Sequence, residues 1–338
     1  MTRFPKRRST ISESGRSTMF RGSRRFLLGC FDMTDTTSLN LMDLMDRFAS
    51  DDKCRDFLEE LRWPKGKVSC PHCGGKSLTE IPARSQWHCL FCQYQFSVTT
   101  GTIMHDSHLP LRKWLIAIYL MLESKKAISA NQMKRTLGLG SYRTAWYLCH
   151  RIREAMGNEP FEGPTLVGII EVDETLMGGK RKNVGRGYRK NKTLVAGALQ
   201  RGGKVRLERI PDVTKETLHS FVSRNVKDEA EAIYTDEWKG YIGLEDDDTR
   251  HETVNHSEEE WVVGDVHTNG IEGVWSLFKR SIVGAFHQIS KKHLDRYIEE
   301  MEWRFNNRNN PHMFRDTLKR ILTTEPLRYR ELVRGKAA

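Results

Sequence analysis

Two pairs of cysteines constrain the fold of this chain more than any other feature of its sequence. The stretch "CPHCGGKSLTEIPARSQWHCLFC" has the spacing C-x2-C-x15-C-x2-C and contains Cys70, Cys73, Cys89 and Cys92. Each CxxC turn aims two thiolates at one point, and fifteen residues suit a β-hairpin that returns the second pair to the first. Four thiolates select Zn²⁺, and such a closed shell is structural, not catalytic. We therefore predict a zinc ribbon over residues 67–105, with residues 94–104 as its last strand.

The composition excludes several classes of protein. Seven cysteines do not pair evenly and four fall in the two CxxC pairs, which indicates metal ligation in a reducing compartment, the cytoplasm, and not a disulfide-linked secreted fold. No apolar run approaches eighteen residues, so we expect no membrane span. The net charge of +11 favours a polyanionic partner, most often nucleic acid, although a basic but ordinary enzyme is an alternative. A chain of 338 residues suggests two or three domains.

The N-terminal segment differs in composition from the rest. Residues 1–32 contain eight Lys or Arg against two acids, and this surplus supplies six of the eleven net charges. Serine and glycine are frequent and no apolar period is visible, so we predict a disordered basic arm over residues 1–37. Alternatively, Met33 is the natural start and residues 1–32 are not translated. Short helices are expected over residues 38–66, with Ser38 or Asn40 as the first cap.

Residues 106–158 read as helical and contain a helix-turn-helix pattern. In "AISANQMKRTLGLGSYRTAWYLCHRIREAM" the turn is residues 138–140, and Ser141 caps the second helix. The apolar positions expected to face inward are Met133, Leu137, Ala145, Leu148 and Ile152. The second helix would expose a basic face suited to DNA, formed by Arg143, His150, Arg151 and Arg153. An ordinary helical hairpin with a solvated face is the alternative.

Residues 166–256 alternate strands with one helix, which predicts an α/β fold with a mixed sheet. "LVGIIEVDET" is an apolar strand that ends near Asp173, and "AEAIYTDEWKGY" is another that ends at Asp236. A helix over residues 214–226 lies between them, and a hairpin is expected around residues 202–203. A further helix begins near residue 268 and carries Glu272. Adjacent central strands would bring the two aspartates side by side, and that helix would deliver Glu272 to them.

Three converging carboxylates predict a metal site. They would repel one another unless cations neutralise them, and oxygen ligands suit Mg²⁺ or Mn²⁺. Two such ions serve phosphoryl transfer by activating the attacking oxygen and stabilising the leaving one. Lys279 lies two helical turns after Glu272, where it would contact a phosphate. The residue pattern alone does not choose between these acids and the neighbouring Glu171, Glu174 and Glu237.

A basic, glycine-broken run at residues 178–192 follows the first strand. It holds seven Lys or Arg and no acid, so we expect a loop near the site. Its cations are candidate contacts to the DNA backbone, namely Lys180, Arg181, Lys182, Arg186, Arg189 and Lys190. A solvated loop without a partner is the alternative.

The combination of these features resembles a known family. The cysteine pairs, "EVDET", "YTDEWKGY", "HTNGIEGVWSLFKR" and "RYIEEMEWRFNNR" are similar to DDE-type bacterial insertion-sequence transposases with an N-terminal zinc ribbon. Within that class the resemblance is to the IS1595 family with its ISXO2-like transposase domain. It covers roughly residues 40 to 320, and the motifs are specific in combination, although each acid alone is weak. The N-terminal arm has no counterpart in it.

The resemblance implies a fold and a set of site residues. It implies a ribonuclease-H-like catalytic domain over residues 164–310, with a mixed five-stranded sheet and flanking helices, followed by a C-terminal tail over residues 311–338. The acidic triad would fall on Asp173, Asp236 and Glu272, with 35 residues between the last two. Lys279 matches the family's basic residue seven positions after the third acid. Because some relatives use Asn in the third role, Asn269 is the reserve candidate.

The resemblance also implies an activity. We expect a transposase that binds the ends of its insertion sequence and target DNA, and that cleaves and joins strands with Mg²⁺ or Mn²⁺. It would act as a homo-oligomer on DNA in the bacterial cytoplasm, at the nucleoid. One alternative is a nuclease of the same fold without strand transfer, which assays on a pre-cleaved end would distinguish. The other is a zinc-ribbon DNA-binding regulator derived from a transposase, which retention of all three acids and Lys279 argues against.

Overall fold

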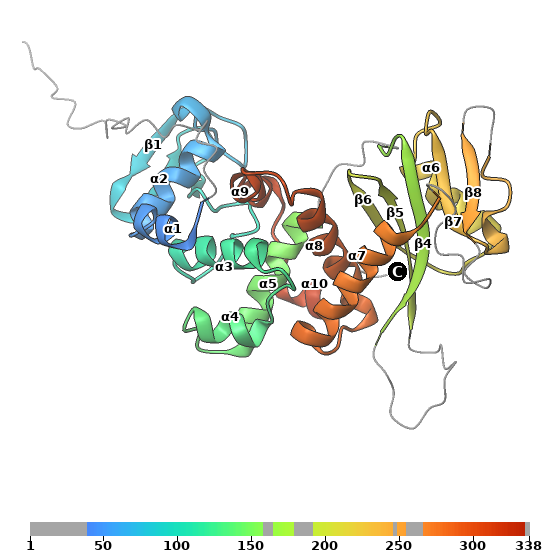
Figure 1. Ribbon diagram of the computed structural model, residues 1–338. Coiled ribbons are helices and arrows are strands. Elements are labelled where there is room, and N and C mark those ends of the chain that lie inside the picture. The colour runs from blue at the N-terminus through green and yellow to red at the C-terminus, as the bar shows by residue number, and fades with distance from the viewer. Residues whose placement is uncertain (1–38, 158–164, 179–191, 246–248, 255–265, 335–338) are drawn as a thin grey trace, which may run out of the picture. The chain divides into compact units, whose positions relative to one another are not determined.

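A five-stranded sheet organises the second half of the chain in a computed structural model that describes residues 39–157, 165–178, 192–245, 249–254 and 266–334. Its strand order is β6-β5-β4-β7-β8. The strands are β4 (Ile169–Met177), β5 (Thr193–Gln200), β6 (Val205–Ile210), β7 (Ala232–Asp236) and β8 (Arg250–Val254). The pairs β4–β5 and β5–β6 are antiparallel, whereas β7 is parallel to both β4 and β8. The predicted mixed sheet, with its hairpin between β5 and β6, is therefore confirmed (Figure 1).

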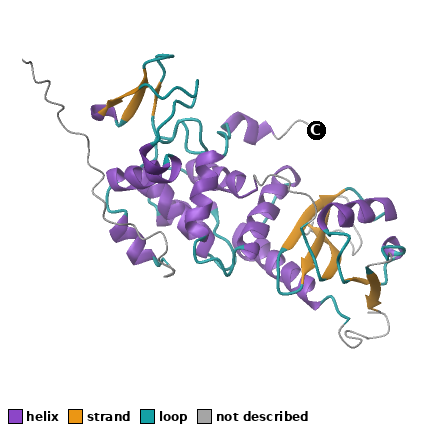
Figure 2. Cartoon of the chain, turned by 90° about the horizontal axis from the view of Figure 1, so that it is seen from above, coloured by secondary structure: helices purple, strands orange, loops and turns teal. Residues whose placement is uncertain are grey.

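Helix α6 (Lys215–Asn225) covers one face of this sheet, and α7 (Asn269–Ser281) together with α8 (Leu294–Asn306) covers the other (Figure 2). Side chains alternate between the two faces along a strand, so neighbouring residues of β4 and β5 enter different cores. Ile170 and Val172 pack with apolar residues of α6. On the other face, Val195 and Leu199 pack with the apolar stripe of α7. The second face therefore carries the helix that contains Glu272.

The cysteine module is a three-stranded antiparallel sheet. It consists of β1 (Leu78–Ile81), β2 (Gln86–Cys89) and β3 (Gln95–Phe96). The central hairpin pairs Leu78 with Cys89, which brings the second CxxC turn back beside the first. The last strand is shorter than predicted, because the chain turns repeatedly after it, through Thr100 and Thr102.

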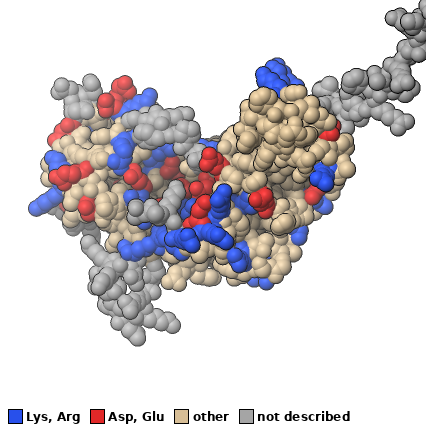
Figure 3. Space-filling model, turned by 180° about the vertical axis from the view of Figure 1, so that it is seen from behind, with Lys and Arg blue, Asp and Glu red and all other residues tan. Residues whose placement is uncertain are grey.

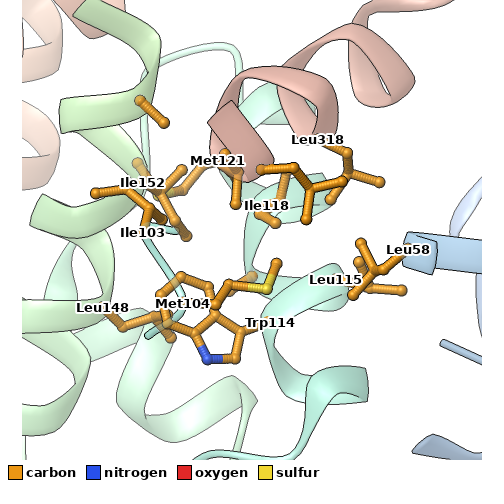
Figure 4. Packing of buried hydrophobic residues seen from close by; sticks show 14 of the residues in the cluster. Leu58, Ile103, Met104, Trp114, Leu115, Ile118, Met121, Leu148, Ile152 and Leu318 are labelled. Carbon is orange, nitrogen blue, oxygen red and sulfur yellow. The ribbon is translucent and has the colours of Figure 1, made fainter. Parts of the chain in front are cut away.

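Helices from both ends of the chain share one apolar core with the cysteine module. The helices are α1 (Leu41–Arg47), α2 (Asp51–Arg62), α3 (Leu111–Glu123), α4 (Ala130–Thr136), α5 (Tyr142–Gly157), α8 (Leu294–Asn306), α9 (Met313–Thr323) and α10 (Tyr329–Arg334). Figure 4 shows Trp114 of α3 packed among Met104, Leu148 and Ile152. None of the described helices is long and apolar enough to span a bilayer.

The expected C-terminal tail differs in the structure. Residues 313–323 and 329–334 are helical, and Leu318 and Leu332 are fully buried in the same core as α3 and α5. Each such burial contributes about 1.5–3 kcal/mol. This segment is therefore part of the folded core, and its helical period was available in the sequence.

Candidate functional site

The four cysteines of the ribbon meet at one point. Their sulfur atoms all lie within 4.8 Å of one another. The pairs Cys70–Cys92 and Cys73–Cys89 are each separated by 3.6 Å between Sγ atoms. A tetrahedron with Zn–S bonds of about 2.3 Å has edges of roughly 3.8 Å, so these separations fit a zinc ion. Cys70, Cys73, Cys89 and Cys92 therefore form the predicted four-cysteine cluster, and it fits Zn²⁺.

Backbone amides around the cluster favour the charged thiolate. The N–H groups of Cys92 and Phe91 donate toward the Cys89 sulfur and lower the pKa of Cys89 to about 7. The Gly75 N–H donates to Cys73 Sγ at 3.4 Å. Burial and the neighbouring thiols, in contrast, raise the pKa of Cys92 to about 12, so the four sulfurs would need a bound cation to be thiolates together.

The two predicted aspartates lie on adjacent parallel strands. Asp236 is the last residue of β7, whereas Asp173 lies in the middle of β4, which runs on to Met177 and does not end near Asp173 as predicted. The register of β4 and β7 pairs Glu171 with Tyr234. Continued by two residues, it sets Asp173 opposite Asp236, and neighbouring strands lie about 4.8 Å apart. Asp236 also acts electrostatically on Asp173. The sequence prediction that these strands bring the two carboxylates side by side thus agrees with the sheet.

Asp173 is fixed against helix α7 by a tryptophan. Trp275 Nε1 donates a hydrogen bond of 2.9 Å to Asp173 Oδ2, and Asp173 Oδ1 accepts from the Glu174 N–H at 2.8 Å. Gly197, the partner of Asp173 in β5, makes room for this ring. A Cβ atom at position 197 would lie 2.6 Å from Trp275 Cζ2. Helix α7 can therefore approach the sheet closely enough for Trp275 to hold Asp173 only because residue 197 is glycine.

A cavity of about 640 Å³ joins Asp173 to the exposed side of α7. Asp173, Glu272 and Lys279 all line it, together with Trp275 and Arg280. Glu272 and Lys279 are exposed and lie on one side of the helix, since seven residues make about two turns. The reserve candidate Asn269 is the exposed first residue of α7 and is not among the lining residues.

The competing glutamates have other partners. Glu171 is 1% exposed, accepts from Arg201 Nε at 2.9 Å and accepts the Ile271 N–H at the start of α7, also at 2.9 Å. It satisfies one of the free N–H groups of the helix terminus. Glu174 points to the other face of β4 and accepts from Tyr241 Oη at 2.6 Å. Both acids are therefore engaged in positioning the elements around Asp173.

The site concentrates negative charge in a half-buried place. Burial, with Glu174 and Asp236 beside it, raises the pKa of Asp173 to about 7. Burial and Asp236 also raise the pKa of Glu174, although its bond from Tyr241 opposes the shift. Among the described residues, the four cysteines form a group whose ligand atoms all lie within 4.8 Å of one another. The carboxylates of the predicted triad do not form such a tight group. A cation between these carboxylates would relieve their repulsion, so the donor set fits a hard divalent ion.

The predicted helix-turn-helix forms, but its second helix does not present the predicted basic face. Ser141 Oγ accepts the Thr144 N–H at 3.1 Å, which confirms the cap, and residues 138–140 form the turn. Arg153, however, is 2% exposed and pairs with Glu300 of α8 at 2.6 Å. Arg151 is 4% exposed and donates to the His105 carbonyl at 2.6 Å. The prediction that both arginines lie on an exposed basic face is therefore wrong, because that face of α5 is covered.

Arg143 and His150 have different outcomes. Arg143 is exposed at the first turn of α5, where its guanidinium lies 4.0 Å from the Tyr329 ring centroid. His150 is fully buried, so it is not part of an exposed face. Of the four side chains predicted to form the basic face of α5, Arg143 alone is exposed.

Burial of His150 predicts a pH-dependent stability. Burial, followed by the charges of Arg153, His293 and Arg296, holds the pKa of His150 far below its usual value. The unfolded chain takes up this proton below about pH 6.5 and the folded chain does not, so stability is complete above that pH and falls as the pH drops. We expect a loss of about 2 kcal/mol from this residue at pH 5. Urea unfolding at pH 7 and pH 5 measures it.

His150→Phe should flatten this pH dependence while keeping the ring contacts with Trp146 and Tyr297. The surface change His108→Gln serves as the control and should leave the profile as it is in the wild type. An unchanged profile in His150→Phe would contradict the assignment.

Some segments for which the sequence predicts a basic arm or DNA contacts lie outside the described residues. These are the arm at residues 1–37 and the loop cations Lys180, Arg181, Lys182, Arg186, Arg189 and Lys190. Their proposed contacts to DNA stay predictions. Conversely, sequence reasoning missed the bonds of Trp275 and Tyr241 to the acids. Only the position of these two residues beside "EVDET" in space reveals this role.

Two segments of the chain match known protein families. Residues 165–306 match the ISXO2-like transposase domain, and residues 49–95 match the transposase zinc-ribbon domain. The first contains Asp173, Asp236 and Glu272, and the second contains the four cysteines.

Individual relatives agree with these matches. The chain is 28% identical over 293 residues to an uncharacterized protein in transposable element ISH50 of Halobacterium salinarum, which covers 82% of this chain and 97% of that protein. It is 34% identical over 98 residues to an uncharacterized transposase-like protein of Haemophilus influenzae, covering 29% and 77% respectively. With its four-cysteine cluster and its mixed sheet, the chain belongs to the family of insertion-sequence transposases that join a transposase zinc ribbon to an ISXO2-like transposase domain.

Proposed function

We propose that this protein binds the ends of an insertion sequence and catalyses metal-dependent DNA cleavage and strand transfer. Asp173, Asp236 and Glu272 would hold Mg²⁺ or Mn²⁺, and Lys279 would contact a phosphate. The proposal rests on one observation: two aspartates lie on adjacent parallel strands, and a helix brings Glu272 and Lys279 into the cavity beside Asp173. Residues 164–310 would form the catalytic domain.

The strand order supports a ribonuclease-H-like catalytic domain. Along the chain, the antiparallel strands β4, β5 and β6 are followed by α6 and then by the parallel strands β7 and β8. The order β6-β5-β4-β7-β8 in the sheet places β4 at the centre. Parallel neighbours open a site at their carboxyl ends, where ligands bind in α/β sheets. Asp236 is the last residue of β7, and Asp173 lies two residues beyond Glu171, the last residue of β4 that pairs with β7.

The charges of the site support the metal. The raised pKa of Asp173 shows that its anion is costly without a counter-charge. Bound divalent ions would lower the pKa of an attacking hydroxyl and stabilise the leaving oxygen. Trp275 orients Asp173 by its hydrogen bond, and Glu171 holds the start of α7 so that Glu272 stays in place. Lys279 would position the phosphodiester beside the carboxylates.

Binding to DNA would come from several parts of the protein. The face in Figure 3 mixes Lys and Arg with Asp and Glu side chains, so net charge alone does not mark the DNA path. Arg143 at the exposed turn of α5 and the cations at 180–190 are the proposed contacts. Juxtaposing two ends of the element would require at least a dimer on DNA, acting at the bacterial nucleoid.

A strand-transfer assay tests the proposal. The substrate is a labelled duplex from the DNA flanking the reading frame, pre-cleaved to leave a 3′-hydroxyl, with supercoiled plasmid as target. With Mg²⁺ or Mn²⁺ we expect the label to become joined to the plasmid. Hydrolysis without joined product would favour the nuclease alternative, and DNA binding without either reaction would favour the regulator. Replacement of Mg²⁺ by Ca²⁺ is the control, because a chelator would also strip zinc from the ribbon.

A further inference from the structure

A second cavity lies between the zinc ribbon, α5 and the segment that leads into α10. Its volume is about 520 Å³, within the range of sites for small organic groups. Asp173, Asp236 and Glu272 do not line it. The lining residues that matter here are His72, Tyr94, Tyr147, Arg151, Arg328 and Tyr329.

Arg151 is buried in the wall of this cavity with unused hydrogen-bonding capacity. Its guanidinium lies 5.1 Å from the Trp114 ring centroid and 5.2 Å from that of Tyr147. Nη2 donates to the His105 carbonyl, but Nε has no hydrogen-bond partner among the described residues. A guanidinium has five N–H donors, and leaving a buried one unpaired costs about 1–3 kcal/mol. Arg151 is 4% exposed and lines the cavity, so its guanidinium places a positive charge in the wall that would attract an anionic ligand.

Aromatic rings form the walls beside this arginine. Tyr94 of the ribbon is 36% exposed and stacks on His72, with ring centroids 5.4 Å apart and planes 29° from parallel. On the other side, Tyr147 and Tyr329 meet edge to face at 5.3 Å. The exposed, stacked pair of Tyr94 and His72 offers ring surface on which a further planar group can stack, and the half-buried Tyr147 and Tyr329 form the facing wall.

The charge of the lining favours an anion. Arg151 and Arg328 are set against the single acid Asp106 among the lining residues. Arg328 is 82% exposed, and its Nε lies 4.0 Å from the carboxylate of Glu331, which also accepts its backbone N–H, so Arg151 is the main source of positive charge in the lining. A buried guanidinium, an exposed cation and flat rings together match a phosphate joined to a planar heterocycle.

We propose that this cavity binds one unpaired nucleotide of a DNA strand, with its phosphate at Arg151 and its base stacked on Tyr94. The inference rests on the proposed function, which makes DNA the substrate. Base stacking on aromatic side chains tolerates any sequence, and unpaired bases reach such cavities while paired ones do not. The pocket would therefore select DNA whose end is opened or frayed.

Binding measurements with the full chain test this site. Fluorescence anisotropy gives the Kd for a short labelled oligothymidylate and for a duplex of the same length. We expect Tyr94→Ala to weaken single-strand binding about fivefold or more, and Arg151→Gln to do the same, with less than about a twofold change for the duplex. Phe91→Ala is the matched control, because Phe91 is an 81% exposed aromatic of the same ribbon that does not line the cavity.

Three outcomes would overturn the site. The first is a Tyr94→Ala protein that is folded and zinc-loaded and still binds the oligothymidylate with wild-type affinity. The second is that this variant loses affinity for the single strand and for the duplex to the same extent. Thymidine 5′-monophosphate binding as tightly as the oligonucleotide is the third, since it would indicate a free nucleotide as ligand. Tyr94 is partly exposed, so its substitution tests the site even if Arg151→Gln fails to fold. Mg²⁺-dependent cleavage of duplex ends is scored separately, so that failure of the pocket and failure of the transposase activity are distinguished.

Discussion

Asp236→Asn should reduce metal-dependent DNA cleavage at least about a thousandfold, because a metal pair contributes several kcal/mol to the transition state of phosphoryl transfer. The substitution keeps the shape of the side chain and its ability to accept the Trp238 N–H, which donates to Asp236 Oδ1 at 3.1 Å. The fold should therefore persist, and binding to the ends of the element should be at least as tight as in the wild type. Single-turnover cleavage with gel-shift titration measures both.

The neighbouring acid provides the control. Glu237 is exposed directly after Asp236, and Glu237→Gln should leave cleavage within a few-fold of the wild-type rate. If Glu237→Gln is inactive and Asp236→Asn cleaves normally, then Glu237, and not Asp236, is the metal ligand. This pair therefore tests the assignment that the residue pattern alone left open.

Cys89→Ser should abolish zinc binding and unfold the ribbon. Structural Zn²⁺ contributes about 10–16 kcal/mol to the folding of isolated zinc-finger peptides, and the loss of one thiolate removes much of this. Cys89 is fully buried and shares its core with Phe96 and the helices around Trp114. We therefore expect destabilisation beyond the ribbon, with a fall in Tm of about 10 °C or more. Metal analysis and thermal unfolding check the two effects.

A buried thiol elsewhere serves as the comparison. Cys149 of α5 is also fully buried, but it lies outside the four-cysteine cluster. Cys149→Ala should lose only the small packing contribution of its sulfur and keep one zinc per chain. Retention of zinc and of ribbon structure in Cys89→Ser would contradict the assignment of the four cysteines as a metal centre.

Short sequence patterns correctly predicted the helix caps, the central strands and the cysteine cluster, because each depends on residues that are close in the sequence. Asn40 and Ser141 cap helices as expected, since an N-cap needs only a side-chain oxygen and the following N–H groups. The apolar runs before Asp173 and Asp236 became adjacent strands because buried strands of this composition pair at the centre of a sheet. The cysteine spacing likewise predicted its own cluster.

Prediction failed where distant segments decide the environment of a residue. Arg153 reads as exposed on its own helix, but its partner Glu300 lies 147 residues further along the chain. Residues 311–338 read as a tail, yet Leu318 and Leu332 complete the core around α3 and α5. The bond from Trp275 to Asp173 spans 102 residues and also needs Gly197 on a third element. Helical periodicity identifies an apolar or basic face but does not say which element will cover it.

Anomalous diffraction from Mn²⁺ in crystals of the full chain with one duplex end tests the central claim most directly. Our account predicts Mn²⁺ density bound by carboxylate oxygens of Asp173, Asp236 and Glu272, beside the scissile phosphate, with Lys279 facing that phosphate. Mn²⁺ bound elsewhere, or an Asp236 carboxylate turned away from an ion held by Asp173, would contradict it.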